Sequence, residues 1–190
     1  MLIEEFSYDI DRVERDRAAL VGQRELDGPG VDFTHEQRRE AAVLRKAEPW
    51  FGAAHDAYGR VWTGAATDAD FDASAPFFYG RWDVGAEEHA ASEREQTNEE
   101  AADIYASRGA FHPEAARTAL TAWDVPVLVL AGEVDGGPLP RVAADIAELF
   151  PRAELAVQPD AGHYPWLDDP RGFTRTVEAF LTQGRGGPTI

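Results

Sequence analysis

The stretch that decides the fold is Val125-Pro126-Val127-Leu128-Val129-Leu130-Ala131-Gly132. Its apolar, β-branched side chains, bounded by turn signals, indicate a strand that is buried on both faces. Asp135 follows just after this strand. A helix-length segment then leads to a second short strand at Leu155 to Val157, and Gly162-His163 follows that one. Ligands bind at the carboxyl ends of strands in open α/β sheets, so Asp135 and His163 are candidate functional residues.

The composition is that of a folded, acidic protein. The chain has 190 residues, 44% of them hydrophobic and 28% charged, which is enough for one domain with an insertion. The net charge of −17 disfavours nucleic acid and anionic membranes as partners. No apolar run has the length of a membrane span, and the N-terminus lacks the layout of a signal peptide. We therefore expect a cytoplasmic protein.

No cofactor or metal is predicted from the sequence. Cysteine is absent, which excludes disulfides, thiolate catalysis and Cys-based metal sites. The histidines outside the candidate site show no H-x-H or H-x-x-x-H spacing, which argues against a zinc site. These histidines are His35, His55, His89 and His112.

The rest of the chain predicts one more strand and a set of helices. Ala19-Leu20-Val21-Gly22 is a candidate strand, and residues 34–108 have a polar, helical pattern. The segments 141–150 and 170–181 each carry one apolar face and predict helices that pack on a sheet. The first helix after residue 34 is expected to bury one apolar stripe, formed by Val43, Leu44, Ala47 and Phe51.

The last 70 or so residues resemble the C-terminal part of an α/β-hydrolase. The resemblance rests on Gly132-Glu133-Val134-Asp135 after one strand and on Asp160-Ala161-Gly162-His163-Tyr164-Pro165-Trp166 before the last helix. Asp11-Arg12-Val13-Glu14-Arg15, followed by Ala19-Leu20-Val21-Gly22, is similar to the P-x-R-V-x-x-L-x-L-V segment of these enzymes without its proline. The helical insertion resembles the cap of proline iminopeptidase-like hydrolases.

This resemblance implies an α/β fold that corresponds to the C-terminal portion of an α/β-hydrolase. Three parallel strands are expected near residues 19–22, 125–131 and 154–158. Residues 1–30 and 113–190 would form a partial hydrolase core, and residues 31–112 an inserted helical cap. The strand near Leu20 would keep an unpaired edge, so we expect self-association or pairing with an N-terminal partner there.

The resemblance gives Asp135 the role of triad acid and His163 that of triad base. Glu133 is the alternative acid. The simpler alternative is that Asp135 is a turn residue before Gly136-Gly137-Pro138 and that His163 is a loop histidine. Tyr164 and Trp166 could line a substrate pocket or pack the last helix onto the sheet.

Two polar segments of the helical region have open interpretations. Glu87-Glu88-His89 is expected to be a solvated helix face. The acidic cluster from Glu93 to Asp103 could attract the cationic amine of a substrate, although such charge runs are commonly solvated surface.

The sequence holds no nucleophile for this pair. A nucleophile elbow needs Ser in G-x-S-x-G, and none of the four serines lies between glycines at that spacing. They are Ser7, Ser74, Ser92 and Ser107. We therefore expect a truncated hydrolase, inactive alone, whose complete form cleaves a small-molecule ester, an amide or a peptide. The alternatives are a non-catalytic binding or accessory protein and one half of a split hydrolase.

Overall fold

The structure is a computed structural model, and it describes residues 35–61, 66–98, 100–101, 104 and 113–183. The predicted strand at 19–22, with the open edge expected there, lies outside the described residues. In chain order the elements are α2 (His35–Leu44), α3 (Phe51–Val61), α4 (Asp68–Ser74), η1 (Ala75–Phe78), α5 (Val84–Gln96), α7 (Pro113–Thr121), β1 (Val127–Gly132), α8 (Pro140–Ala147), β2 (Ala153–Gln158), α9 (Pro165–Asp168) and α10 (Pro170–Gln183).

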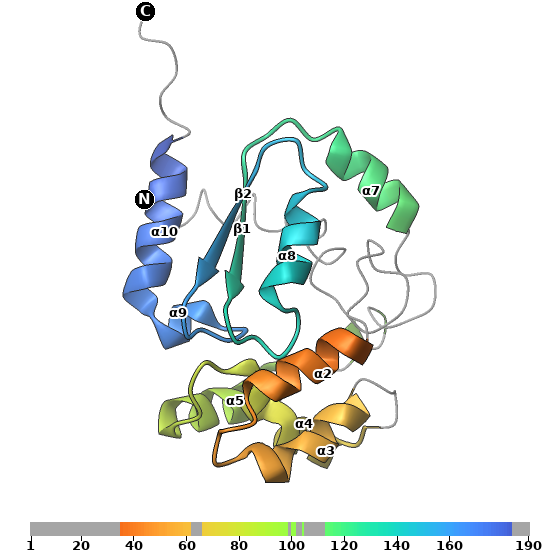
Figure 1. Ribbon diagram of the computed structural model, residues 1–190, viewed down its shortest axis with the longest axis vertical. Helices are drawn as coiled ribbons and strands as arrows, with labels where there is room; N and C mark the ends of the chain where they lie inside the picture. Colours follow the sequence, from red (N-terminus) through yellow and green to blue (C-terminus); the bar gives the residue numbers. More distant parts are fainter. Residues whose placement is uncertain (1–34, 62–65, 99, 102–103, 105–112, 184–190) are drawn as a thin grey trace, which may run out of the picture.

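Two parallel strands form the sheet of the described residues. β1 and β2 pair in register from Val127 opposite Ala153 to Gly132 opposite Gln158. They match the strands predicted near 125–131 and 154–158. α8 makes the crossover between them, and Figure 1 shows the sheet between α8 and α10. A parallel sheet with a helix on each face is the α/β arrangement that the sequence predicts.

The main core lies on the α8 side of the sheet. Pro140 begins α8, where the missing N–H of proline has no intrahelical partner to lose. Val142 of α8 is fully buried, and burial of such a side chain contributes about 1.5–3 kcal/mol. Val127 of β1 and Ala153 of β2 pack against this cluster. Its buried residues are Ala41, Leu120, Leu139, Val142, Ile146 and Phe150.

The helices α2 to α5, together with η1, form a second layer, here called the helical layer. Figure 1 shows this layer at the carboxyl ends of β1 and β2. Its own core contains Phe77, which is fully buried and stacks on the ring of Tyr58 with centroids 4.2 Å apart. α2 joins the two layers, because Ala41 belongs to the sheet core and Ala42 to the core of the helical layer.

The prediction that Val43 and Leu44 belong to a buried apolar stripe is wrong, whereas Phe51, the first residue of α3, packs against the core of the helical layer. Val43 is 66% exposed and Leu44 is 55% exposed, whereas Ala41 and Ala42 are buried. The two sides of α2 that pack against the cores are covered by Ala41 and Ala42. The larger apolar residues at the end of the helix therefore face outward.

Candidate active site

Asp135 lies in the turn that follows β1. Its side chain is buried, and its Oδ1 accepts a hydrogen bond of 2.8 Å from the backbone N–H of Gly137. Its Oδ2 lies 2.9 Å from Nδ1 of His163. The turn is also tied to the loop after β2, because the N–H of Val134 donates to the carbonyl of Ala161 at 3.0 Å. Asp135 is thus a buried side chain held from two directions and aimed at one imidazole.

His163 reaches Asp135 from the loop that follows β2. Its backbone N–H donates to the carbonyl oxygen of Phe78 at 2.8 Å, and the Phe78 ring lies edge-on to the imidazole. A carboxylate only accepts hydrogen bonds, so this contact assigns the proton of the neutral ring to Nδ1. Nε2 then keeps its lone pair and can accept a proton. The imidazole is 30% exposed, so a reacting group can reach the ring.

The surroundings of His163 set its proton affinity. Burial, the largest single influence, lowers the pKa of the imidazole, whereas the charge of Asp135 and its hydrogen bond raise this pKa. The Glu93 carboxylate and the Gly137 backbone add to this rise, and the net result is a pKa above the ordinary 6.5. A histidine can take a proton in one step and return it in the next, and a raised pKa favours the protonated form.

Glu133, the alternative acid, has a different partner. Its Oε2 accepts a hydrogen bond of 3.0 Å from the backbone N–H of Asp160. Asp160 has a φ of 55°, the left-handed conformation that Asp tolerates better than most residues. Glu133 thus supports the turn before the histidine loop, and the carboxylate that contacts His163 is that of Asp135.

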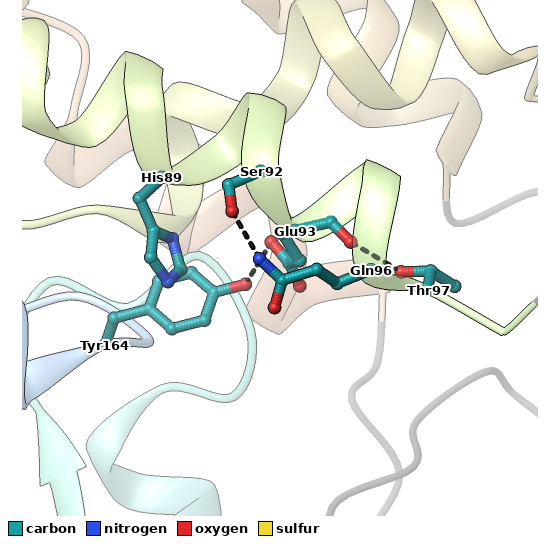
Figure 2. Close-up of a pocket in the computed structure, with 6 residues that line it drawn as sticks. All are labelled: His89, Ser92, Glu93, Gln96, Thr97 and Tyr164. Atoms are coloured by element: carbon teal, nitrogen blue, oxygen red, sulfur yellow. Dashed lines mark hydrogen bonds between the residues drawn. The ribbon is translucent and has the colours of Figure 1, made fainter.

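Tyr164 forms one wall of an open hollow between the histidine loop and α5. The hollow has a volume of about 350 Å³, and Figure 2 shows the side chains that line it. The Tyr164 hydroxyl donates to Oε2 of Glu93 at 2.8 Å, and the phenol ring lies 5.3 Å from the imidazole of His163, centroid to centroid. Burial, followed by the nearby Glu93, raises the pKa of Tyr164. The lining residues are His89, Ser92, Glu93, Gln96, Thr97 and Tyr164.

Trp166, the other predicted pocket residue, lies between Tyr164 and α10. Its ring makes edge-on contacts with Tyr164 at 5.6 Å and with Phe173 of α10 at 5.9 Å, centroid to centroid. It is 45% exposed. These contacts fit the packing role considered for this position, with part of the indole facing solvent.

Arg45 at the end of α2 is a residue of this region that the sequence did not indicate. Its side chain is 2% exposed and donates to the carbonyls of Tyr79 at 2.7 Å and Gly80 at 3.2 Å. It also reaches the carbonyl of Val134, next to Asp135, at 3.4 Å. Burial lowers the pKa of Arg45, and the Glu48 carboxylate opposes that effect. Arg45 therefore connects the helical layer to the turn that carries the acid.

The two serines of the described residues are not placed at a strand-to-helix turn. Ser74 is the last residue of α4, is fully buried, and donates to the carbonyl of Phe71 at 3.0 Å. Ser92 lies inside α5 and accepts a hydrogen bond from Gln96. Ser7 and Ser107 lie outside the described residues. The described part of the chain thus contains the Asp135–His163 pair, and neither of its serines lies in a nucleophile elbow.

The described ranges were also searched for metal clusters and membrane spans. Within them, no three His, Asp or Glu side chains are grouped so that they could hold a metal ion. In the same residues, no helix has both the length and the apolar character needed to cross a bilayer.

Comparisons with known proteins point to one fold. No family model matches the chain. A stretch of 57 residues is 46% identical to the pimeloyl-[acyl-carrier protein] methyl ester esterase of Cronobacter sakazakii, covering 30% of this chain and 22% of that enzyme. The structure of MenH from S. aureus matches with a TM-score of 0.51 at 18% identity, over 79% of this chain and 54% of that one. A proline iminopeptidase of Mycobacterium smegmatis matches with a TM-score of 0.47 at 24% identity, over 78% and 53%.

The chain therefore has a partial α/β-hydrolase fold. The resemblance found in the sequence and the fold class that it implies are confirmed at this level. The chain spans about half the length of each of these two solved structures. The 57-residue match covers a still smaller share, 22%, of the Cronobacter sakazakii esterase.

Proposed function

We propose that Asp135 and His163 are the acid and the base of a serine-type hydrolase, which in its complete form cleaves ester or amide bonds. The observation that carries this proposal is the 2.9 Å contact between Asp135 Oδ2 and His163 Nδ1. The two residues follow consecutive parallel strands of a partial α/β-hydrolase fold. In such folds the triad acid precedes the histidine in the chain, as Asp135 precedes His163 here.

The arrangement has a direct mechanism. Nε2 of His163 takes the proton of a nucleophilic hydroxyl as it attacks the carbonyl carbon of the substrate. The imidazolium then gives this proton to the leaving alcohol or amine. Asp135 keeps the ring in the required tautomer and stabilises its charged form, which the raised pKa of His163 reflects.

The nucleophile is the missing part, and we propose that it lies outside these 190 residues. It would come from a longer form of the protein or from a separate N-terminal partner. Loss of a triad serine lowers kcat by about 10⁶. One oxyanion donor is the backbone N–H that follows the nucleophile, so it would be supplied with the same segment. The chain alone is therefore expected to be inactive.

In this proposal the helical layer is a cap over the site, within an insertion of residues 31–112. Its position at the carboxyl ends of β1 and β2 supports this assignment (Figure 1). The hollow between Tyr164 and α5 would receive part of the substrate, and Glu93 places a carboxylate where a cationic amine could bind. The 57-residue stretch shared with a methyl ester esterase supports an ester as one substrate class.

The test is turnover of p-nitrophenyl esters by the purified chain, with and without the polypeptide encoded directly upstream of Met1. The chain alone is expected to give background rates. An upstream polypeptide that carries G-x-S-x-G should restore turnover, and H163Q and D135N should abolish it. H55Q is the matched control, because His55 lies on α3 with a side chain that is 51% exposed. Turnover that survives H163Q would exclude His163 as the base.

The open hollow favours one second candidate, a non-catalytic binding protein. Its lining surface is about equally polar and apolar, and it offers one carboxylate, Glu93, beside the Tyr164 hydroxyl. This candidate predicts saturable binding of a small amine, such as a proline ester, that E93Q weakens at least tenfold while no upstream polypeptide confers turnover. Calorimetric titration of the wild-type chain and of E93Q tests this binding, and the turnover assay with the upstream polypeptide distinguishes the two candidates.

A further inference from the structure

The loops that carry Asp135 and His163 meet at one turn of the helical layer, residues 77–81. His163 donates its backbone N–H to the carbonyl of Phe78 in this turn. Arg45 binds two further carbonyls of the turn and also reaches the carbonyl of Val134, beside the acid. The turn is therefore a shared support for both members of the pair.

Asp168 links the turn to the histidine loop through a single oxygen. Its Oδ2 accepts a hydrogen bond of 3.0 Å from the N–H of Gly80 and one of 2.8 Å from the N–H of Gly162, the residue before His163. The side chain of Arg81 also donates to the carbonyl of Asp168 at 2.7 Å. The carboxylate thus bridges two backbone segments that are 82 positions apart in the sequence.

The two bridged segments are in backbone contact, and both bridged residues are glycines. A Cβ atom on Gly80 would lie 2.0 Å from the carbonyl oxygen of Asp160, and one on Gly162 would lie 2.5 Å from that of Phe78. Real Cβ atoms do not approach other atoms this closely, so any side chain would push the segments apart. Glycine at both positions therefore permits the contact, and the Asp168 carboxylate holds it.

We infer that Asp168 is a positioning residue for His163, which acts by locking the histidine loop onto the 77–81 turn so that the imidazole meets Asp135. The hydrogen bonds of the carboxylate go to backbone amides and not to the imidazole. Asp168 therefore affects His163 by fixing the position of the loop that carries it. The inference rests on the proposed function only for its consequence in catalysis.

The test follows the His163 ring by NMR, which needs no nucleophile and so remains independent of whether the chain hydrolyses anything. D168A removes the bridge, and G162A separates the same two segments without altering the charge of Asp168. The carboxylates that act on the imidazole, those of Asp135 and Glu93, are unchanged in both variants. The matched control is D169N, because Asp169 caps α10 by accepting from the N–H of Gly172.

In D168A and in G162A the pKa of His163 should fall by about half a unit or more toward its ordinary value, because the imidazole moves away from Asp135. Hydrogen exchange of the His163 backbone N–H should become at least about tenfold faster, because its bond to Phe78 opens. D169N should change neither quantity. D168N keeps the size of the side chain and one acceptor oxygen, so it should show the same changes at reduced size.

The inference would be overturned by variants that melt at lower temperature while the pKa and the exchange rate of His163 stay at wild-type values. That result would make Asp168 a general brace of the fold. If D168A does not fold, the same two measurements, the pKa and the exchange rate of His163, are made on D168N and G162A. Wild-type behaviour of His163 in both of these variants is also a refutation.

Discussion

Replacing Asp135 by Asn isolates the electrostatic part of the candidate site. D135N keeps the shape of the side chain, and its amide oxygen can still accept from the N–H of Gly137. The variant removes the charge that faces His163. Burial, which lowers the pKa of the imidazole, then loses its main opposing influence. We expect the pKa of His163 to fall from above its ordinary value of 6.5 to below it.

The size of the change follows from the geometry. An opposite charge at such short range shifts a pKa by about 1–3 units. Because the His163 side chain is 30% exposed, solvent screening reduces the effect, and each unit of change in a pKa corresponds to about 1.4 kcal/mol. The wild-type pKa is higher in the folded than in the unfolded state. The pair therefore stabilises the fold fully below the unfolded pKa of about 6.5, and this contribution is lost as the pH rises through the folded pKa.

The assay is urea unfolding of the wild-type chain, D135N, H163Q and the double variant, at a pH of about 5.5 and again at about 8.5. The coupling energy should be larger at the lower pH, where an imidazolium faces the carboxylate. At the higher pH it should fall to the contribution of the hydrogen bond from the neutral Nδ1–H, about 0.5–1.5 kcal/mol. The pair of His55 and Asp56 is the control, since its side chains are 51% and 85% exposed and should couple by less than about 0.5 kcal/mol. Equal coupling at both pH values would refute the reasoning.

Three further variants test two contacts of the site and its support and one ion pair between α3 and α4. Arg45→Met leaves buried backbone carbonyls without a donor and should lower the free energy of unfolding by about 2–4 kcal/mol in urea, with Arg45→Lys intermediate. Tyr164→Phe removes the bond to the exposed Glu93 and should cost about 0.5–1 kcal/mol, and adding E93Q should cause little further loss. The Arg60 guanidinium holds the pKa of Asp70 well below its usual 3.8, so D70N should melt below the wild type at neutral pH, and this difference should vanish as the pH falls through the folded pKa of Asp70.

The contact between Asp135 and His163 could be predicted because it depends on local signals. Each residue follows a short apolar strand, and two parallel strands joined by a crossover end at the same edge of a sheet. The order of the two residues in the chain, Asp135 before His163, can be read directly from the sequence. The catalytic role of the pair stays a prediction, because the residue on which they would act is absent from the sequence.

The supporting contacts could not be predicted for a physical reason. Arg45 binds carbonyl groups 34, 35 and 89 positions away, and a backbone carbonyl has no signature in the sequence. His89 shows the same limit. Glu87 and Glu88 are exposed as expected for a solvated face, but Nδ1 of His89 lies 2.8 Å from the hydroxyl of Tyr79. The helical pattern predicts which residues share a face of the helix. Only the tertiary fold determines which of these polar residues gains a hydrogen-bond partner.

The helical layer helps to position Asp135 and His163. Its Tyr58 hydroxyl donates to the carbonyl of Gly136, one residue beyond Asp135, and its Phe78 carbonyl holds the N–H of His163. The turn that carries Asp135 follows β1, and the loop that carries His163 follows β2. The sheet therefore fixes only where these two segments begin. Since the contacts that carry them to within 2.9 Å of each other include partners from the helical layer, the geometry of the pair is a joint product of both layers. A movement that separated the turn after β1, which carries Asp135, from turn 77–81 would therefore also separate His163 from Asp135.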